Sequence, residues 1–185
     1  MEIPRQPEPT SVPPEGQHAT PCCGGGCGIG PSSGGRLNLL LSMGGWQQDP
    51  WVDRLPKLLE PIGIHSLRAE SGQQAADLIR RYRVHVAVVD LGLPLEQGSV
   101  GGVGGSGEEA GPQILELIRR LDQPPPTVVV KRSRSHRDDC REMAAALRAG
   151  AFAVIDRPRQ QADLEVLLEV LRRCLQRHYK NRWPT

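Results

Sequence analysis

Asp90 is the residue whose chemical type and place in the sequence most clearly suggest a functional role. It follows a nearly continuous apolar, β-branched run at residues 84–89 and precedes a Leu-Gly-Leu-Pro sequence at 91–94. Such a run is typical of a buried strand in the middle of a parallel sheet. Ligands of such sheets bind beyond the carboxyl ends of the strands. A carboxyl group at this point is therefore the first candidate for a functional side chain.

Three other predicted strands end in residues that are expected near Asp90. The carboxyl ends of parallel strands lie at one edge of the sheet, so the side chains that follow them share one surface. These residues are Ser42 and Met43 after the first strand, Lys131 and Ser133 after the fourth, and Arg157 after the fifth.

The elements that must position these residues alternate along the chain. Apolar runs predict strands at 37–41, 64–69, 84–89, 127–130 and 152–155. Helical spacing of apolar residues predicts helices at 49–62, opened by Asp49, then at 71–82, 112–121, 140–149 and 162–178. Strict alternation with short connections predicts an α/β fold, a five-stranded parallel sheet with helices on both faces. This is the doubly wound class of α/β fold.

Composition divides the chain into a tail and one domain. Residues 1–36 are rich in proline and glycine and poor in apolar side chains, which predicts a disordered tail. The folded domain is expected at 37–180, with a Gly-rich insertion at 96–110 forming a long loop. Cys140 and Cys174 fall within helical patterns and are expected to be small buried residues.

The bulk composition excludes several classes of function. The chain has 185 residues and a formal net charge of +2, which gives no case for nucleic-acid binding without a recognisable motif. No window is apolar enough to span a membrane, and residues 1–21 do not form a secretory signal, so we expect a cytoplasmic protein. Cys22, Cys23 and Cys27 have only His18 as a possible fourth metal ligand, which disfavours a zinc site.

Residues 37–176 resemble the receiver domain of bacterial response regulators. Three stretches carry the resemblance: 86–94 with Asp90 and its Leu-Pro ending, 111–120, and 150–158 with a Gly-Ala, a strand and an Arg-Pro ending. The resemblance implies that Asp90 is a phosphoacceptor in phosphorelay, or two-component, signal transduction. It also implies Mg²⁺ as cofactor and a histidine kinase, phosphotransfer protein or other signalling protein as partner.

The departures from the receiver pattern fall on the chemistry. Ser42 and Met43 stand where receivers have two acidic residues that hold a divalent metal. Lys131 takes the place of a Ser/Thr, for which Ser133 and Ser135 are close enough to substitute, and Arg157 replaces a lysine. Mg²⁺ is usually bound through one or two carboxylates, so it is expected only if phosphorylation is retained. The sequence thus predicts a degenerate receiver, not an enzyme, that acts by protein–protein interaction.

Two alternatives remain open from the sequence. One is an interaction domain that uses the last helix and the basic segment 131–137, which we expect to be a solvated loop. The other is a flavodoxin-like nucleotide-binding or enzymatic domain that uses the same edge of the sheet.

Overall fold

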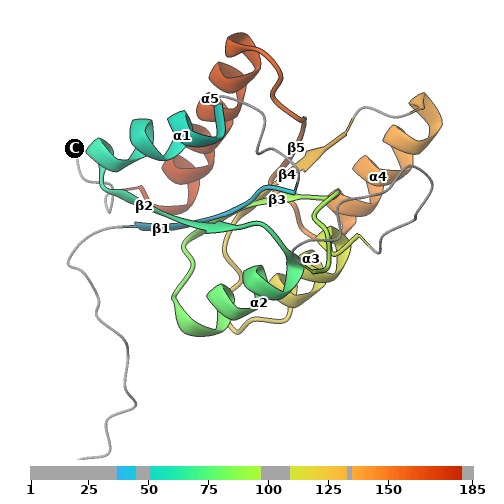
Figure 1. Ribbon diagram of the computed structural model, residues 1–185, viewed down its shortest axis with the longest axis horizontal. Helices are drawn as coiled ribbons and strands as arrows, with labels where there is room; N and C mark the ends of the chain where they lie inside the picture. Colours follow the sequence, from blue (N-terminus) through green and yellow to red (C-terminus); the bar gives the residue numbers. More distant parts are fainter. Residues whose placement is uncertain (1–36, 45–50, 97–108, 133–134, 181–185) are drawn as a thin grey trace, which may run out of the picture.

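The computed structural model describes residues 37–44, 51–96, 109–132 and 135–180 (Figure 1). The predicted tail at 1–36, the helix start at Asp49, most of the Gly-rich insertion and Ser133 lie outside the described residues. Within the described part of the chain, no helix is both long and apolar enough to cross a membrane.

Five strands form one parallel sheet in the order β2-β1-β3-β4-β5. The strands are β1 (Leu37–Ser42), β2 (Ile64–Ala69), β3 (Val86–Asp90), β4 (Thr127–Lys131) and β5 (Ala153–Asp156). β3 lies in the centre, and all five of its residues are buried. The predicted α/β fold with a five-stranded parallel sheet is confirmed.

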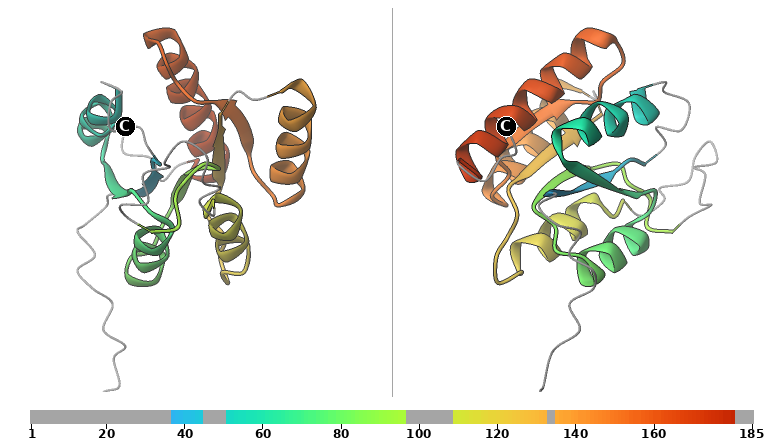
Figure 2. Two further views of the ribbon diagram at one scale, coloured as in Figure 1. Left: turned by 45° about the vertical axis from the view of Figure 1, so that its right-hand side comes forward. Right: turned by 90° about the vertical axis from the view of Figure 1, so that its left-hand side faces the viewer.

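Helices cover both faces of this sheet (Figures 1 and 2). They are α1 (Trp51–Leu59), the 3₁₀ turn η1 (Glu60–Ile62), α2 (Gly72–Arg81), α3 (Gly111–Arg119), α4 (His136–Arg148) and α5 (Gln161–His178). α1 and α5 lie on one face, and α2 and α3 lie on the other. α4 joins the second face through Ala146, beside β4 and β5.

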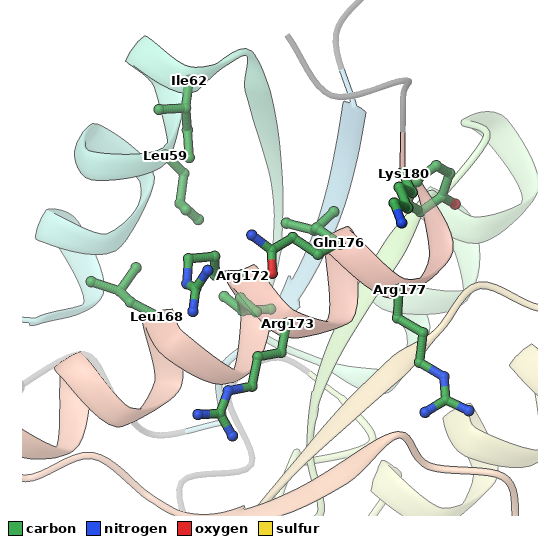
Figure 3. Close-up of a pocket in the computed structure, with 11 residues that line it drawn as sticks. Leu59, Ile62, Leu168, Arg172, Arg173, Gln176, Arg177 and Lys180 are labelled. Atoms are coloured by element: carbon green, nitrogen blue, oxygen red, sulfur yellow. The ribbon is translucent and has the colours of Figure 1, made fainter. Parts of the chain in front are cut away.

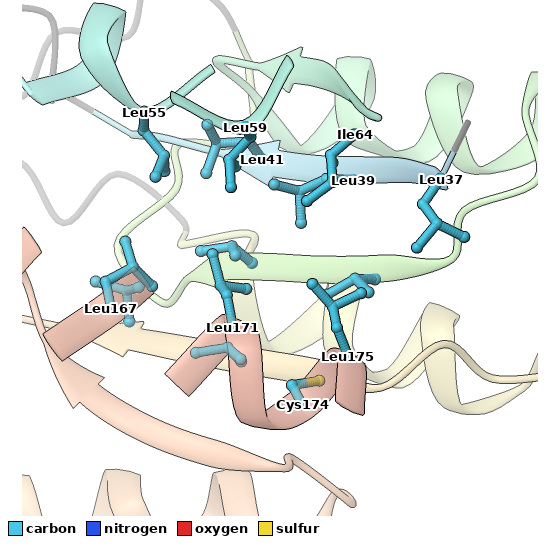
Figure 4. Close-up of a cluster of buried hydrophobic side chains, with 14 of the residues drawn as sticks. Leu37, Leu39, Leu41, Leu55, Leu59, Ile64, Leu167, Leu171, Cys174 and Leu175 are labelled. Atoms are coloured by element: carbon cyan, nitrogen blue, oxygen red, sulfur yellow. The ribbon is translucent and has the colours of Figure 1, made fainter. Parts of the chain in front are cut away.

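Each face has its own apolar core. On the first face, leucines of β1, α1 and α5 point toward one another, among them Leu39, Leu59 and Leu171 (Figure 4). On the second face, Leu40, Ala87 and Val129 of the sheet meet α2 and α3. Complete burial of one such leucine contributes roughly 1.5–3 kcal/mol. The two cores pack against opposite faces of the sheet and keep the ends of its strands in register.

Local sequence explains where several elements begin and end. Ser71 begins α2 by accepting a hydrogen bond from the backbone N–H of Gln74 at 3.2 Å, as predicted. Gly63 ends η1 in the left-handed conformation, with φ of 84°, which glycine adopts without a steric penalty. Asp163 accepts the backbone N–H groups of Arg159 and Gln160 and so caps the start of α5.

Two predictions near α4 are wrong. The helix begins at His136 and not at Cys140, because Ser135 accepts the N–H of Asp138 and acidic residues occupy the first turn. His136 and Arg137 are therefore helical and not part of a loop. Cys140 is exposed and not buried, since α4 buries only Ala146, whereas Cys174 of α5 is buried as expected.

The two ends of the Gly-rich insertion meet at the sheet edge. Pro94 and Glu109 form an isolated antiparallel bridge, and the N–H of Ala110 donates to the carbonyl of Leu93 at 2.7 Å. Gly111 then packs against the backbone of Asp90 and Leu91, where a Cβ atom would lie 2.4 Å from the Leu91 Cα. The chain thus returns to the end of β3 to start α3.

Candidate functional site

Asp90 is fully buried at the carboxyl end of β3. Its Oδ1 atom accepts a hydrogen bond of 2.8 Å from the backbone N–H of Gly92. The turn that follows is closed by the N–H of Leu93, which donates to the Asp90 carbonyl at 3.2 Å. The carboxyl group is therefore positioned by the backbone of its own loop. This is the place in the sheet that the sequence predicted for it.

Ser42 joins β1 to β3 directly beside Asp90. Its hydroxyl donates to the carbonyl of Val88 at 3.1 Å and accepts from the backbone N–H of Asp90 at 3.0 Å. The residue is fully buried. The Ser42 hydroxyl therefore satisfies one backbone donor and one backbone acceptor of β3, and it holds the backbone of Asp90 in place.

Met43 follows Ser42 and belongs to the hydrophobic core. It is buried in the cluster between the sheet and the α1/α5 layer. Its N–H donates to the carbonyl of Ala69 at 2.9 Å, which extends the β1–β2 pairing by one residue. Ser42, which ends β1, and Met43, which follows it, thus serve backbone hydrogen bonding and apolar packing.

Lys131 lies at the end of β4 with its side chain almost completely buried, 6% exposed. Its Nζ atom is 2.6 Å from Asp156 Oδ1 and 3.0 Å from Asp139 Oδ2. Burial by itself would lower the pKa of this ammonium, but the hydrogen bonds to Asp156 and Asp139 outweigh burial and raise the pKa above its usual value. The Lys131 charge is therefore neutralised by two carboxylates, one from β5 and one from α4.

Arg132, the next residue, is exposed and lies across the loops that follow β1 and β3. Its Nη2 atom donates to the carbonyl oxygens of Gly92 at 3.3 Å and Gly44 at 3.4 Å. Within the described residues it has no carboxylate partner. From the sequence, Lys131, Arg132 and Arg157 could all supply positive charge at this edge, but nothing indicated that the Arg132 side chain would reach the loop that follows β1.

Arg157 follows β5 at the same edge. Its N–H donates to the Lys131 carbonyl at 2.8 Å, so the backbone pairing of β4 and β5 continues to this residue. The side chain is partly buried, and its Nε atom is buried. The structure thus brings Asp90, Lys131 and Arg157 to one edge of the sheet, while Ser133 lies outside the described residues.

Comparisons with known proteins identify the architecture. No protein-family profile matches the sequence, and no curated protein matches it. A two-component response regulator from Clostridium difficile is similar in structure, with a TM-score of 0.58 and 17% identity over 78% of this chain and 100% of that chain. A CheY-like response regulator receiver domain protein from Methanospirillum hungatei has a TM-score of 0.52 and 20% identity over 77% and 98% of the two chains.

This chain has the receiver-domain fold. The signal receiver domain of a histidine kinase from Syntrophus aciditrophicus is also similar, with a TM-score of 0.54 and 16% identity over 77% of this chain and 92% of that chain. At such identities the likeness concerns the fold alone. What the candidate site can do chemically depends on its side chains at the carboxyl edge, the edge of the sheet where the carboxyl ends of the strands lie.

The residues beside Asp90 do not fit the Mg²⁺ that the receiver fold implies. Mg²⁺ prefers oxygen ligands and is usually bound through one or two carboxylates. The Ser42 hydroxyl is engaged with the backbone of β3, and the Met43 thioether is a soft ligand buried in the core. In the described part of the chain, no group of three or more His, Cys, Asp or Glu side chains is placed to hold a metal ion.

A separate groove of about 1030 Å³ lies between η1 and the second half of α5 (Figure 3). Leu59 and Ile62 line one side, and Leu168 lies across from them on α5. Tyr179, which also lines the groove, donates its hydroxyl to the carbonyl of His85 just before β3. The groove therefore lies toward the amino ends of the strands, away from Asp90. Sequence analysis missed it, because amphipathic spacing places these leucines in the core.

Proposed function

We propose that this chain is a receiver-like signalling module that acts by binding another protein and does not depend on phosphorylation of Asp90. The observation that carries the proposal is the β1 side of the carboxyl edge, where Ser42 and Met43 serve the fold and neither supplies a carboxylate to a metal. The receiver fold supports a partner from two-component signalling, such as a histidine kinase or a phosphotransfer protein.

The state of Asp90 supports the same conclusion. Phosphoryl transfer depends on positioning of the reactants and on charge neutralisation, which metal ions commonly supply. Asp90 is fully buried, and its Oδ1 accepts the Gly92 N–H, so an attacking carboxylate would first have to be exposed. Lys131 is neutralised by Asp139 and Asp156, so its charge is already balanced.

A phosphodonor assay tests this proposal. Wild type and Asp90→Asn are incubated with a small phosphodonor and Mg²⁺, and intact-mass spectrometry measures phosphoryl incorporation. We expect no stoichiometric modification of either protein. Stoichiometric modification of wild type that is lost in Asp90→Asn would overturn the proposal, because it would show a working phosphoacceptor.

The groove between η1 and α5 supplies a surface for the partner. Its apolar lining is bordered by Arg177 and Lys180, which have no ion pair within the described residues. Exposed apolar surface of this kind is typical of protein-binding sites. An amphipathic helix of the partner, apolar on one side and flanked by acidic residues, matches both the lining and the charge of the border.

Binding of candidate partners separates the groove from the Asp90 edge. Purified histidine-kinase and phosphotransfer domains are titrated calorimetrically with wild type, Asp90→Asn and Ile62→Asp, and with Leu147→Asp as a matched exposed control on α4. We expect Ile62→Asp to weaken binding by on the order of tenfold or more, since it places a charge in an apolar contact. Asp90→Asn and Leu147→Asp should bind like wild type. Loss of binding in Asp90→Asn alone would contradict the proposal.

A further inference from the structure

We infer that Arg132 takes the place of a divalent cation at the carboxyl edge, with its guanidinium joining the backbone carbonyls of the loops that follow β1 and β3. The inference rests on the proposed phosphorylation-independent function and names the group that makes a metal unnecessary there. It starts from the disagreement between the receiver fold, which implies Mg²⁺, and the side chains beside Asp90, which do not fit it.

The geometry converges on one guanidinium nitrogen. Arg132 Nη2 lies 3.3 Å from the Gly92 oxygen and 3.4 Å from the Gly44 oxygen. Gly44 comes two residues after the end of β1, and Gly92 comes two residues after the end of β3. One side chain from the end of β4 therefore bridges the ends of three strands that are neighbours in the sheet.

Two glycines make this approach possible. A Cβ atom on Gly92 would lie 2.8 Å from Arg132 Nε and 3.0 Å from its Cζ, so the guanidinium lies directly against the Gly92 backbone. A Cβ atom on Gly44 would lie 2.7 Å from the Leu93 Cα and from the Pro94 Cδ. The loops after β1 and β3 are thus in close contact at Gly44, and the missing side chain of Gly92 leaves room for the guanidinium.

The chemistry of this end of the sheet favours a cation. The carbonyl oxygens of Gly44 and Gly92 accept from the same Arg132 nitrogen, and the N–H of that Gly92 donates to the buried carboxyl group of Asp90. Such oxygen groups are the ligands that hard divalent cations take. A guanidinium is permanently charged and carries five N–H donors, so it can donate to both carbonyl oxygens without a metal.

Lys131 cannot fill this role, although it is the adjacent cation. Its ammonium is held by Asp139 and Asp156, on the β4–β5 side of the edge. Arg132 has no carboxylate partner in the described residues, and its charge is directed at the carbonyl groups. The distances of 3.3 and 3.4 Å are longer than the roughly 2.9–3.0 Å typical of N–H···O bonds, so the contact can open without unfolding the domain.

Paramagnetic Mn²⁺ tests the inference on the full chain. Backbone amide signals of Gly44, Gly92 and Leu93 are followed by NMR during addition of millimolar Mn²⁺, without a phosphodonor. We expect no selective broadening in wild type, because the guanidinium occupies the cation position. We expect selective broadening in Arg132→Ala, and its loss when Asp90→Asn is added to that variant.

Two further variants separate charge from packing. Arg132→Lys keeps a cation and should behave like wild type, whereas Arg132→Gln keeps hydrogen-bond donors without charge and should behave like Arg132→Ala. Hydrogen exchange of the Gly92 amide should be faster in Arg132→Ala by on the order of tenfold, because the loop opens more often. Arg80→Ala, an exposed arginine on α2, is the control and should change neither measurement.

The inference is overturned if wild type itself shows selective broadening, if Arg132→Ala gains none, or if Arg132→Gln behaves like wild type. These outcomes are distinct from a failure of the proposed function. Phosphorylation of Asp90 in the donor assay would remove the proposed function and leave the Mn²⁺ result unaffected, because no donor is present in the NMR experiment.

Discussion

The two halves of the carboxyl edge are built by different physical means. On the β1 side, Ser42 and Met43 contribute neutral hydrogen bonds and apolar packing. On the β4–β5 side, a buried lysine is neutralised by Asp139 and Asp156. Asp90 lies between them at the end of β3. The two carboxylates that contact Lys131 therefore lie on the side opposite to the one where receivers hold their metal.

This difference shows that the two sides of one sheet edge can be held together by different interactions. A serine that bonds to both Val88 and Asp90 can hold β1 against β3 without any ion. In the charged half, Asp139 and Asp156 balance the charge of Lys131. Arg132 contacts the loop that follows β3 instead of a carboxylate. Four predictions, three on substitutions and one on pH, test whether the halves differ in this way.

Met43→Asp should have the largest effect. It introduces an acidic residue on the β1 side and places its carboxylate in the apolar cluster around β1 and α5. Burial of an unpaired charge is costly, and we expect a loss of roughly 3–5 kcal/mol of unfolding free energy. Urea denaturation measures it. Met43→Leu is the control, for which we expect less than about 1.5 kcal/mol. A stable Met43→Asp protein would show that the β1 side is not a packed core.

Lys131→Ala should have the next largest effect. It leaves Asp139, 24% exposed, without its buried cation, while Asp156 at 65% exposure can be solvated. We expect a loss of roughly 2–3 kcal/mol, below the ~3–5 kcal/mol found when a fully buried pair is broken. Asp156→Ala should cost less than about 1 kcal/mol, since that carboxylate is largely exposed. Equal losses in the two variants would contradict the asymmetry of this ion pair.

Ser42→Ala should cost about 1–2 kcal/mol, because the buried N–H of Asp90 and carbonyl of Val88 both lose a hydrogen bond. Ser66→Ala on β2 is a matched control. The Ser66 hydroxyl is buried and has no hydrogen-bond partner among the described residues, so its removal should change stability by less than about 0.5 kcal/mol or increase it. Chemical denaturation of both variants measures the difference. An equal loss in both would remove the special role of Ser42.

The smallest expected effect is a dependence of stability on pH that arises from Lys131 and its two carboxylate partners. The pKa of Lys131 is raised in the folded protein, because its hydrogen bonds to Asp156 and Asp139 outweigh burial. The pair therefore contributes its full stability below the ordinary lysine pKa of 10.5 and loses it as pH rises through the higher folded value. The free energy of unfolding, measured across this alkaline range, should fall with rising pH in wild type and fall less in Lys131→Met. Ser42→Ala should keep the wild-type pH dependence.

Much of the fold could be predicted because its signals are local. The continuous apolar run of β3 and the serine that caps α2 each specify their element from a few neighbouring residues. The start of α4 was misplaced because the basic residues around His136 suggested a loop, while the capping bond of Ser135 to Asp138 is not apparent from charge alone. The burial of Cys140 was mispredicted for a related reason: helical spacing does not show how little of α4 the sheet covers.

The sequence by itself determined that Asp90 ends a central strand and that no acidic pair follows β1, because strand periodicity and residue type are properties of short segments. Only the tertiary structure decided where the neighbouring charges go. Lys131 and Arg132 are adjacent in the chain, yet one is held between α4 and β5 and the other reaches the loops of β1 and β3. Side-chain direction at a strand end depends on which carboxylates and carbonyls the packed helices and loops bring within reach. Gly44 is 88 residues from Arg132 in the sequence and Asp156 is 25 residues from Lys131, so both contacts form only through folding.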